Sequence, residues 1–312
     1  MPVRTTILVA ALLLACGAPV GAQDTDGFYL SVATGLTSSF GPDVTAFGAN
    51  HPTRCDRLLY ADPASAPTDA ACTAPLTSSR QGAYAFDRNS GTAQALAVGY
   101  AMGSLRFEGE LLLREQGGAA TPFEVAADVS LIGKDTEWSA LSPPSADIHS
   151  FRSREVFANA FYAFRGFSGW TPYLGAGAGL ASMDFGFRAG FLRKSTAEGY
   201  LEAFGGSRSN PEAAPEWQRA AAGTLSVMDS AVNETAFGYQ LLAGLDRALS
   251  ERTTLGMKIR WSSLQTASAD LQAKVIRSHR PVHADGQTPF FWEFEFAGMG
   301  YLGAALEMRY HF

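Results

Sequence analysis

Alternation of apolar and polar side chains is the strongest pattern in the sequence. In residues 105–114 the odd-numbered positions are mainly Leu and Phe, whereas the even-numbered positions carry Arg and Glu, with Leu112 as the exception. Residues 254–262 and 301–312 repeat the design. Because successive side chains of a strand point to opposite faces, a period of two predicts β-strands with one apolar and one polar face.

Five further segments show the same period with less contrast, because their second face consists mostly of Ala and Gly. They are 27–37, 92–102, 154–165, 171–185 and 235–247. The connections between the eight predicted strands alternate in length. Short ones at 103–104, 166–170 and 248–252 separate long ones at 38–91, 116–153, 188–234 and 266–292.

This alternation of connections is typical of a barrel in an outer membrane, with tight turns in the periplasm and long loops outside. A soluble sandwich would rarely contain four such loops. We therefore predict an all-β protein, an eight-stranded antiparallel up-and-down transmembrane β-barrel with four long extracellular loops. Weak β character at 124–132 and 199–204 leaves open a ten-stranded barrel, or strands that extend above the membrane.

The first 22 residues are predicted to be a secretory signal peptide, which leaves residues 23–312 as the barrel. Arg4 precedes an apolar stretch too short to span a bilayer, and Val20, Gly21 and Ala22 are small residues of the kind signal peptidase reads. Lipidation at Cys16 is the alternative, because Leu13–Cys16 resembles a lipobox.

Export to an oxidising compartment suits the two remaining cysteines. Cys55 and Cys72 lie in one polar segment without the spacing of a metal motif. We predict that they form a disulfide, which would stabilise the loop by about 3 kcal/mol.

Composition narrows the class further. The mean hydropathy of −0.01 leaves no room for several apolar helices of about 20 residues. Charged residues make up only 17% of the chain and aromatic residues 12%, which argues against disorder. A net charge of −6 argues against nucleic acid as a partner, because phosphate contacts need clustered Lys and Arg.

The polar faces of the best-defined strands should form a charge network in the lumen. Isolated charges in so narrow a space would each cost several kcal/mol, so a mutually paired network is expected. We interpret it as a plug, and an ion path or gate is the alternative. The predicted members are Arg106, Glu108, Glu110, Lys258, Arg260, Glu307 and Arg309.

Aromatic residues are expected in girdles at the two membrane interfaces. One set falls near the short turns, namely Phe28, Trp170, Tyr173, Tyr310 and Phe312. The other falls near the long loops, namely Phe185, Phe187, Trp292, Phe294 and Phe296.

The chain resembles the eight-stranded outer-membrane barrels of Gram-negative bacteria, the group that contains the OmpA transmembrane domain, OmpX and the opacity-type surface proteins. The resemblance rests on the signal peptide, the eight alternating segments, the loop pattern and the last strand. It implies that Met308, Tyr310 and Phe312 form the signal read by the barrel-assembly machinery, and it suggests a porin-like surface antigen. No cell-wall-binding domain is expected after the barrel.

Catalytic chemistry has weak support in the sequence. His51, His149, His279 and His283 fall in predicted loops. The pairs His149–Ser150 and Ser278–His279 are adjacent in sequence, but neighbours in a strand point opposite ways, so adjacency is no evidence of a dyad. We therefore expect no enzyme, no cofactor and no metal. The expected partners are outer-membrane lipids, lipopolysaccharide and an extracellular partner of the loops. A small porin and a lipid-modifying enzyme are the alternatives.

Overall fold

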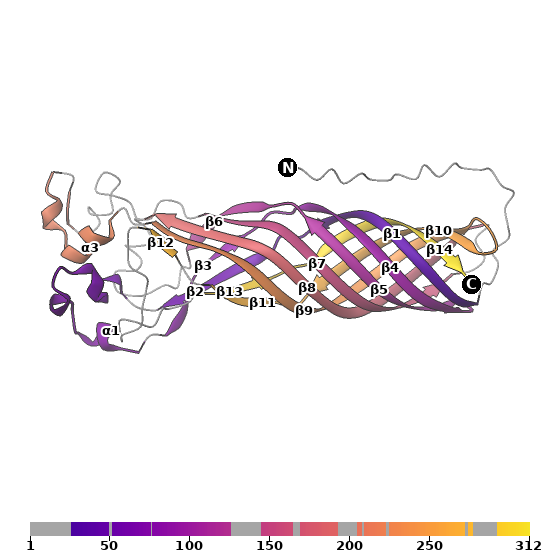
Figure 1. The fold of residues 1–312 in the computed structure, drawn as a ribbon, viewed down its shortest axis with the longest axis horizontal. Coiled ribbons are helices and arrows are strands. Elements are labelled where there is room, and N and C mark those ends of the chain that lie inside the picture. The colour runs from indigo at the N-terminus through magenta and orange to yellow at the C-terminus, as the bar shows by residue number, and fades with distance from the viewer. Residues whose placement is uncertain are drawn as a thin grey trace.

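The computed structural model describes residues 26–49, 52–75, 77–125, 145–164, 169–192, 205–207, 209–222, 225–271, 274–276 and 292–312. Within them, eight long strands form a closed antiparallel barrel. The last strand pairs with the first, from Tyr29 opposite His311 to Ser39 opposite Tyr301, and this seam closes the wall. The predicted fold is therefore confirmed (Figure 1). In order around the barrel the strands are β1 (Gly27–Ser39), β4 (Ser90–Met102), β5 (Leu105–Gln116), β7 (Ser145–Ala163), β8 (Thr171–Leu192), β9 (Leu225–Ala248), β10 (Thr253–Leu264) and β14 (Tyr301–His311).

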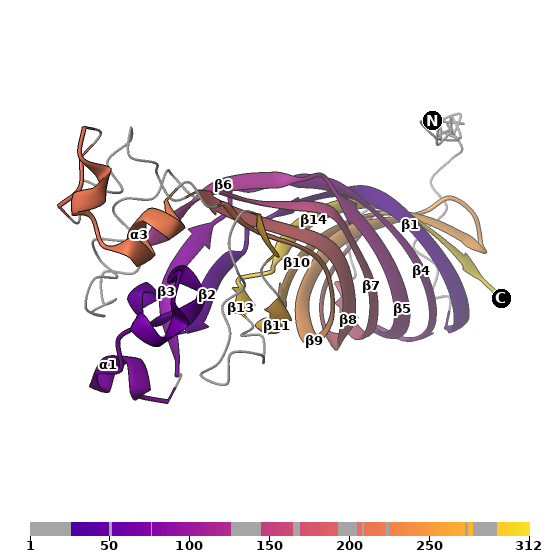
Figure 2. The same cartoon turned by 60° about the vertical axis from the view of Figure 1, so that its left-hand side comes forward.

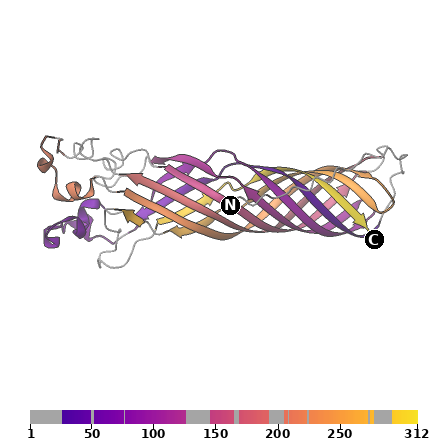
Figure 3. The same cartoon turned by 45° about the horizontal axis from the view of Figure 1, so that its top comes forward.

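The barrel wall continues well beyond one membrane thickness. A spanning strand needs about 9–11 residues, whereas β7, β8 and β9 have 19, 22 and 24. The other strands break and resume, so further strands lie beside these three, most of them in segments predicted as loops (Figures 1 and 3). They are β2 (Asp43–Ala49), β3 (Ser78–Ala85), β6 (Ala119–Val125), β11 (Ala267–Leu271), β12 (Lys274–Ile276) and β13 (Trp292–Ala297).

These strands extend the barrel wall on the side of the long connections. Strands that extend above the membrane were one of the two alternatives left open by the sequence. β6 includes the first residues of the segment 124–132, and it continues β5 along the neighbouring strand β7. The remainder of that segment and residues 199–204 lie outside the described residues, as does the predicted signal peptide.

The strand breaks have a local cause in the sequence. Gly41 between β1 and β2 has φ of +78°, and a Cβ there would lie 2.0 Å from the carbonyl oxygen of Phe86. Pro42 follows and has no N–H for a ladder. Gly298, between β13 and β14, has φ of +68°. Such residues bend the strands where the wall leaves the lipid belt.

The outer surface changes character along the barrel. From the short turns up to the level of Leu113, Val156 and Leu180, the outward positions carry exposed apolar side chains. Farther along the same strands the outward positions carry charged side chains such as Glu115 and Arg154, which are also exposed. The apolar belt marks the membrane, and the polar part above it belongs to the outer face.

Several residues predicted for the aromatic girdles lie inside the barrel instead. Tyr173 is 2% exposed and packs in the lumen against Phe161. In the upper barrel, Phe185, Phe187, Phe294 and Phe296 are also buried, so their assignment to a membrane girdle was wrong. The reason is the reversed pattern above the membrane, where water is outside and the apolar face turns inward. Phe28, Trp170, Tyr310 and Phe312 are exposed on the outside near the short turns.

Two long connections carry short helices that stand beyond the open end of the strands (Figures 1 and 2). None of the described helices is long and apolar enough to cross a membrane. The first connection contains η1 (Thr53–Cys55), η2 (Arg57–Leu59), η3 (Pro63–Ser65) and α1 (Ala70–Thr73), and the third contains η6 (Pro211–Ala213) and α3 (Glu216–Ala221).

Candidate functional site

The membrane-embedded lumen is filled by a balanced set of charges. Among the described residues, five cationic and five acidic side chains are buried there together with His311. All seven predicted members are present. Arg114, Glu155 and Asp246 join them and were not among the predicted members. The complete set is Arg106, Arg114, Lys258, Arg260 and Arg309 with Glu108, Glu110, Glu155, Asp246 and Glu307.

Lys258 occupies the centre of this lumen network. Its Nζ lies 2.8 Å from Glu307, 3.4 Å from Glu108 and 3.5 Å from Glu110. Arg260 lies next to it on the same face of β10 and reaches Glu110 at 2.6 Å. Two strands on opposite sides of the barrel, β5 and β10, are thus joined through the lumen by charge-assisted hydrogen bonds.

A second group of contacts lies toward the short turns. Asp246 accepts hydrogen bonds from Arg106 at 2.9 Å and from Arg309 at 3.0 Å. Arg309 also donates to Glu307 at 3.0 Å. Tyr29 donates to Glu108 at 3.1 Å, and its ring covers Gly99, where a Cβ would lie 2.1 Å from the ring carbon Cζ. Small residues on β4 therefore give the large lumen side chains their space.

The uppermost charged pair faces the extracellular end. Arg114 donates from Nε to Glu155 at 2.9 Å, and its guanidinium lies 3.8 Å from the centre of the Tyr301 ring. Tyr301 and Ser153 also donate to Glu155, at 2.8 and 2.7 Å. Glu155 is fully buried, so these three donors replace the water that it would bind in solution.

Above the charges, the lumen becomes apolar. Phe185 packs against Phe296, and Phe187 packs against both Phe294 and Phe296, with ring centres 5.0–5.4 Å apart. Tyr84, Met183 and Met228 belong to the same buried cluster. The lumen therefore consists of two layers, a neutral charge network inside the membrane and a hydrophobic core above it.

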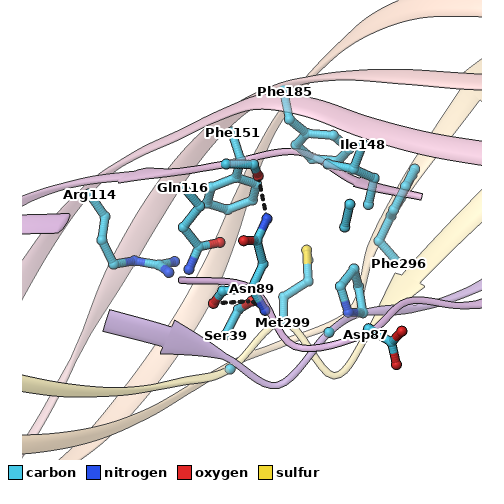
Figure 4. Close-up of a pocket in the computed structure, with 15 residues that line it drawn as sticks. Ser39, Asp87, Asn89, Arg114, Gln116, Ile148, Phe151, Phe185, Phe296 and Met299 are labelled. Atoms are coloured by element: carbon cyan, nitrogen blue, oxygen red, sulfur yellow. Dashed lines mark hydrogen bonds between the residues drawn. The ribbon is translucent and has the colours of Figure 1, made fainter. Parts of the chain in front are cut away.

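A cavity of about 40 Å³ lies where the two layers meet, at the level of the strand breaks (Figure 4). Arg114 and Gln116 lie on one side, and Ile148, Phe185 and Phe296 lie on the other, with Met299 between them. Farther down, a void beside Lys258 and Arg260 measures about 20 Å³. That volume holds about one water molecule.

The helices of the first and third connections pack on each other to form an extracellular cap, which consists of residues 52–75 and 209–222. Its small core consists of Leu59, Ala214 and Ala221. The backbone N–H of Ala61 donates to Glu216 of α3 at 2.6 Å, which joins the two connections. The Cys55–Cys72 disulfide lies within the first of them.

An ion pair reinforces the disulfide-bonded part of the cap. Arg54 donates two hydrogen bonds to Asp69, at 2.5 and 3.0 Å. The carboxylate of Asp69 also accepts from the backbone N–H of Ala71 and caps α1. The hydrogen bonds from Arg54 lower the pKa of Asp69.

One predicted loop histidine lies in a strand. His149 sits at a bulge of β7 beside Ser150, which has φ of +56°. Its Nδ1 lies 3.0 Å from Asp147, and its Nε2 lies over Gly186. A Cβ at Gly186 would be 2.1 Å from that nitrogen, so the second ring nitrogen faces backbone. The other predicted loop histidines, His51, His279 and His283, lie outside the described residues.

The residues of the predicted assembly signal share one face of β14. Met308, Tyr310 and Phe312 are exposed on the outer wall, and His311, between the last two, points inward. The ring of Tyr310 packs edge-on against Phe312 at 5.5 Å between centres.

Comparison with known proteins gives similarity at the level of architecture. No protein-family model and no curated protein matches the sequence. The solved structure of Neisserial surface protein A, NspA, is 14% identical over 92% of this chain and 97% of its own, with a TM-score of 0.36. OprG from Pseudomonas aeruginosa is 10% identical over 92% and 98%, with a TM-score of 0.39. The outer-membrane protease OmpT from Escherichia coli is 8% identical over 92% and 97%, with a TM-score of 0.41.

The class of the protein follows from its own barrel. Each of the eight long strands pairs with a neighbour on both sides, so the wall has no edge within the exposed apolar belt, which suits lipid. The protein is an integral β-barrel of the outer membrane. Its architecture is that of the eight-stranded barrels of the OmpA and OmpX type, as the resemblance implied.

Proposed function

We propose that the protein is a non-enzymatic surface protein that binds an extracellular partner through its cap. The observation that carries the proposal is the packing of two connections into one folded unit at the outer end of the barrel. Recognition commonly resides in loops held by a rigid scaffold. A disulfide and a buried core lower the entropic cost of presenting such a surface.

The two layers of the lumen support a closed barrel. A conducting path would have to pass both the paired charges and the tightly packed Phe cluster. Among the described residues, no hydroxyl or thiol is hydrogen-bonded to a ring nitrogen of His149, so this histidine has no paired nucleophile, which supports a non-enzymatic role.

The test compares cells that display the wild-type protein with cells that display a variant in which residues 52–75 are replaced by a Gly–Ser linker. Adhesion is measured on immobilised glycans, matrix glycoproteins and purified lipopolysaccharide. We expect the wild-type protein to adhere to at least one surface and the variant to lose adhesion while its barrel still migrates as a folded band.

A control variant, Ala158→Leu, changes an outward position of β7 and leaves the cap intact. Adhesion that survives removal of residues 52–75 would contradict the proposal. Hydrolysis of lipid or peptide substrates by purified protein, lost on substitution His149→Ala, would favour an enzyme. Steady conductance in planar bilayers would favour a small porin.

A further inference from the structure

We propose that the cavity between the two lumen layers is a binding site for a small amphiphile, namely a short alkyl group with an oxygen acceptor close to it. The ligand would enter through the barrel wall beside β4 and β5. The proposal is independent of the cap, and it leaves the lumen closed because the cavity ends at the Phe cluster.

The wall has a gap in its backbone ladder at this point. The pairing of β4 with β5 ends at Gly91 opposite Gln116, and the pairing of β3 with β6 begins at Tyr84 opposite Phe123. Between these two points a single backbone hydrogen bond, from the N–H of Gly117 to the carbonyl oxygen of Ser90 at 3.4 Å, joins the described residues 85–90 to 117–122.

Side chains close this gap in place of a regular ladder. The side-chain amide of Asn89 donates to the carbonyl oxygens of Gly117 and Gly118, at 2.6 and 2.8 Å. Thr121 donates to the carbonyl oxygen of Ala85 at 2.7 Å. Side-chain contacts can be released without breaking a strand pair, so this part of the wall can open while the ladders on both sides of it stay intact. Asp87 and Gly117, both exposed, form the rim.

The interior of the cavity has one apolar and one polar side. Ile148, Phe185, Phe296 and Met299 provide the apolar surface. On the polar side, Nε2 of Gln116 is buried and has no hydrogen-bond partner among the described residues. A buried amide donor without an acceptor is costly, and a ligand oxygen would remove that cost.

The size of the cavity limits the ligand. A volume of 40 Å³ holds about three water-sized groups, roughly a propyl end. An acyl chain of a membrane lipid has its oxygen atoms much farther from its methyl end, so it would not place an acceptor at Gln116. The gap also lies at a polar level of the wall, because the neighbouring outward residues Thr92, Glu115 and Arg152 are exposed. The geometry therefore favours a short water-soluble amphiphile.

The methionines of the chain allow a direct test with 2-butanone, an acceptor with a short alkyl group. Refolded full barrel, labelled with ¹³C at the methionine methyl groups, is titrated in lipid nanodiscs and followed by NMR. We expect the Met299 signal to shift and saturate, with half-saturation on the order of millimolar. Met257 and Met308 face the lipid and report partition into the bilayer, and Met183 and Met228 lie in the closed core.

Two variants locate the site. Ala119→Leu fills the cavity and should abolish the saturable shift, whereas Ala158→Leu on the lipid face should preserve it. Gln116→Leu keeps the shape, removes the donor and should weaken binding about twofold to tenfold. A Met299 signal that moves only linearly with Met257 overturns the proposal, and so does a saturable shift that survives Ala119→Leu. Broadening of Met299 by lipid with a nitroxide at its chain end would also overturn it, because a lipid tail would then occupy the cavity.

Discussion

Replacement of Lys258 by methionine should destabilise the barrel more than any single surface substitution. Lys258 is 3% exposed, and it is the cation that three carboxylates share. Methionine has a similar length and no charge. The substitution leaves five buried carboxylates facing four cations among the described residues. Removal of one partner from a buried ion pair typically costs about 3–5 kcal/mol.

This loss of unfolding free energy can be measured as a shift of the urea unfolding midpoint. For a protein of this size the dependence of unfolding free energy on urea is about 3 kcal/mol per molar, so the midpoint should fall by about 1–2 M. The measurement is a urea titration of refolded barrel, followed by tryptophan fluorescence and by the folded band in gel electrophoresis. A double variant, Lys258→Met with Glu307→Gln, restores neutrality and should recover part of the loss.

A matched control uses an ion pair on the outer wall. Arg188 lies 2.9 Å from Asp229, and both side chains are about half exposed, so Arg188→Met should cost less than about 1 kcal/mol. If Lys258→Met has an equally small effect with an unchanged urea dependence, the lumen is wet enough to solvate the three carboxylates. The interpretation of the network as a dry plug would then be wrong.

Three further predictions concern conductance and the cap. Wild-type barrel and the double variant Glu110→Gln, Arg260→Met should both be silent in planar bilayers, because the apolar layer remains in place; substitution-dependent channels would refute this. Replacement of Cys55 and Cys72 by serine should cost the cap about 3 kcal/mol and expose it to limited proteolysis, with the folded barrel band unchanged. Because the pKa of Asp69 is lowered in the folded cap, its contribution is complete above the ordinary carboxyl range and is lost as the pH falls through the lowered value. Hydrogen exchange of the cap should accelerate only below about pH 4, and Asp69→Asn should remove this pH dependence.

Most of the barrel could be predicted from alternation because the membrane imposes sharp contrast between the two faces of a strand. Lys258 and Arg260 alternate with Met257 and Ile259, so their inward direction is unambiguous. The same alternation, followed by residue number alone, would also have predicted that Tyr173, Phe185 and Phe187 point into the lumen. All three have odd residue numbers, as Gly175 does, and in an unbroken strand the odd-numbered side chains all point to the same face. For Phe185 and Phe187, polarity misled the assignment because the solvent outside the strand changes from lipid to water.

Other features of the lumen and the cap could not be predicted from alternation along single strands. Phe294 and Phe296 point inward at even positions, whereas the inward residues of β14 are odd, because the break at Gly298–Gly300 shifts the phase. Asp246 and Glu155 lie on faces with little charge contrast, so nothing nearby marked them as partners of Arg106 and Arg114. The packing of the first connection on the third depends on contacts between distant segments, and no local pattern encodes it.

The distribution of the lumen charges along the chain has a consequence for the order of assembly. Strands β5 and β7 supply Arg106, Glu108, Glu110, Arg114 and Glu155, whereas β9, β10 and β14 supply the other five charged groups. Arg106 pairs with Asp246, and Lys258 and Arg260 pair with Glu108 and Glu110, so these bonds join the two halves of the chain. A sheet that has not closed would present unpaired charges toward the membrane. Closure should therefore be an all-or-none step, in which the arrival of the last strands neutralises the first ones and makes the barrel compatible with lipid.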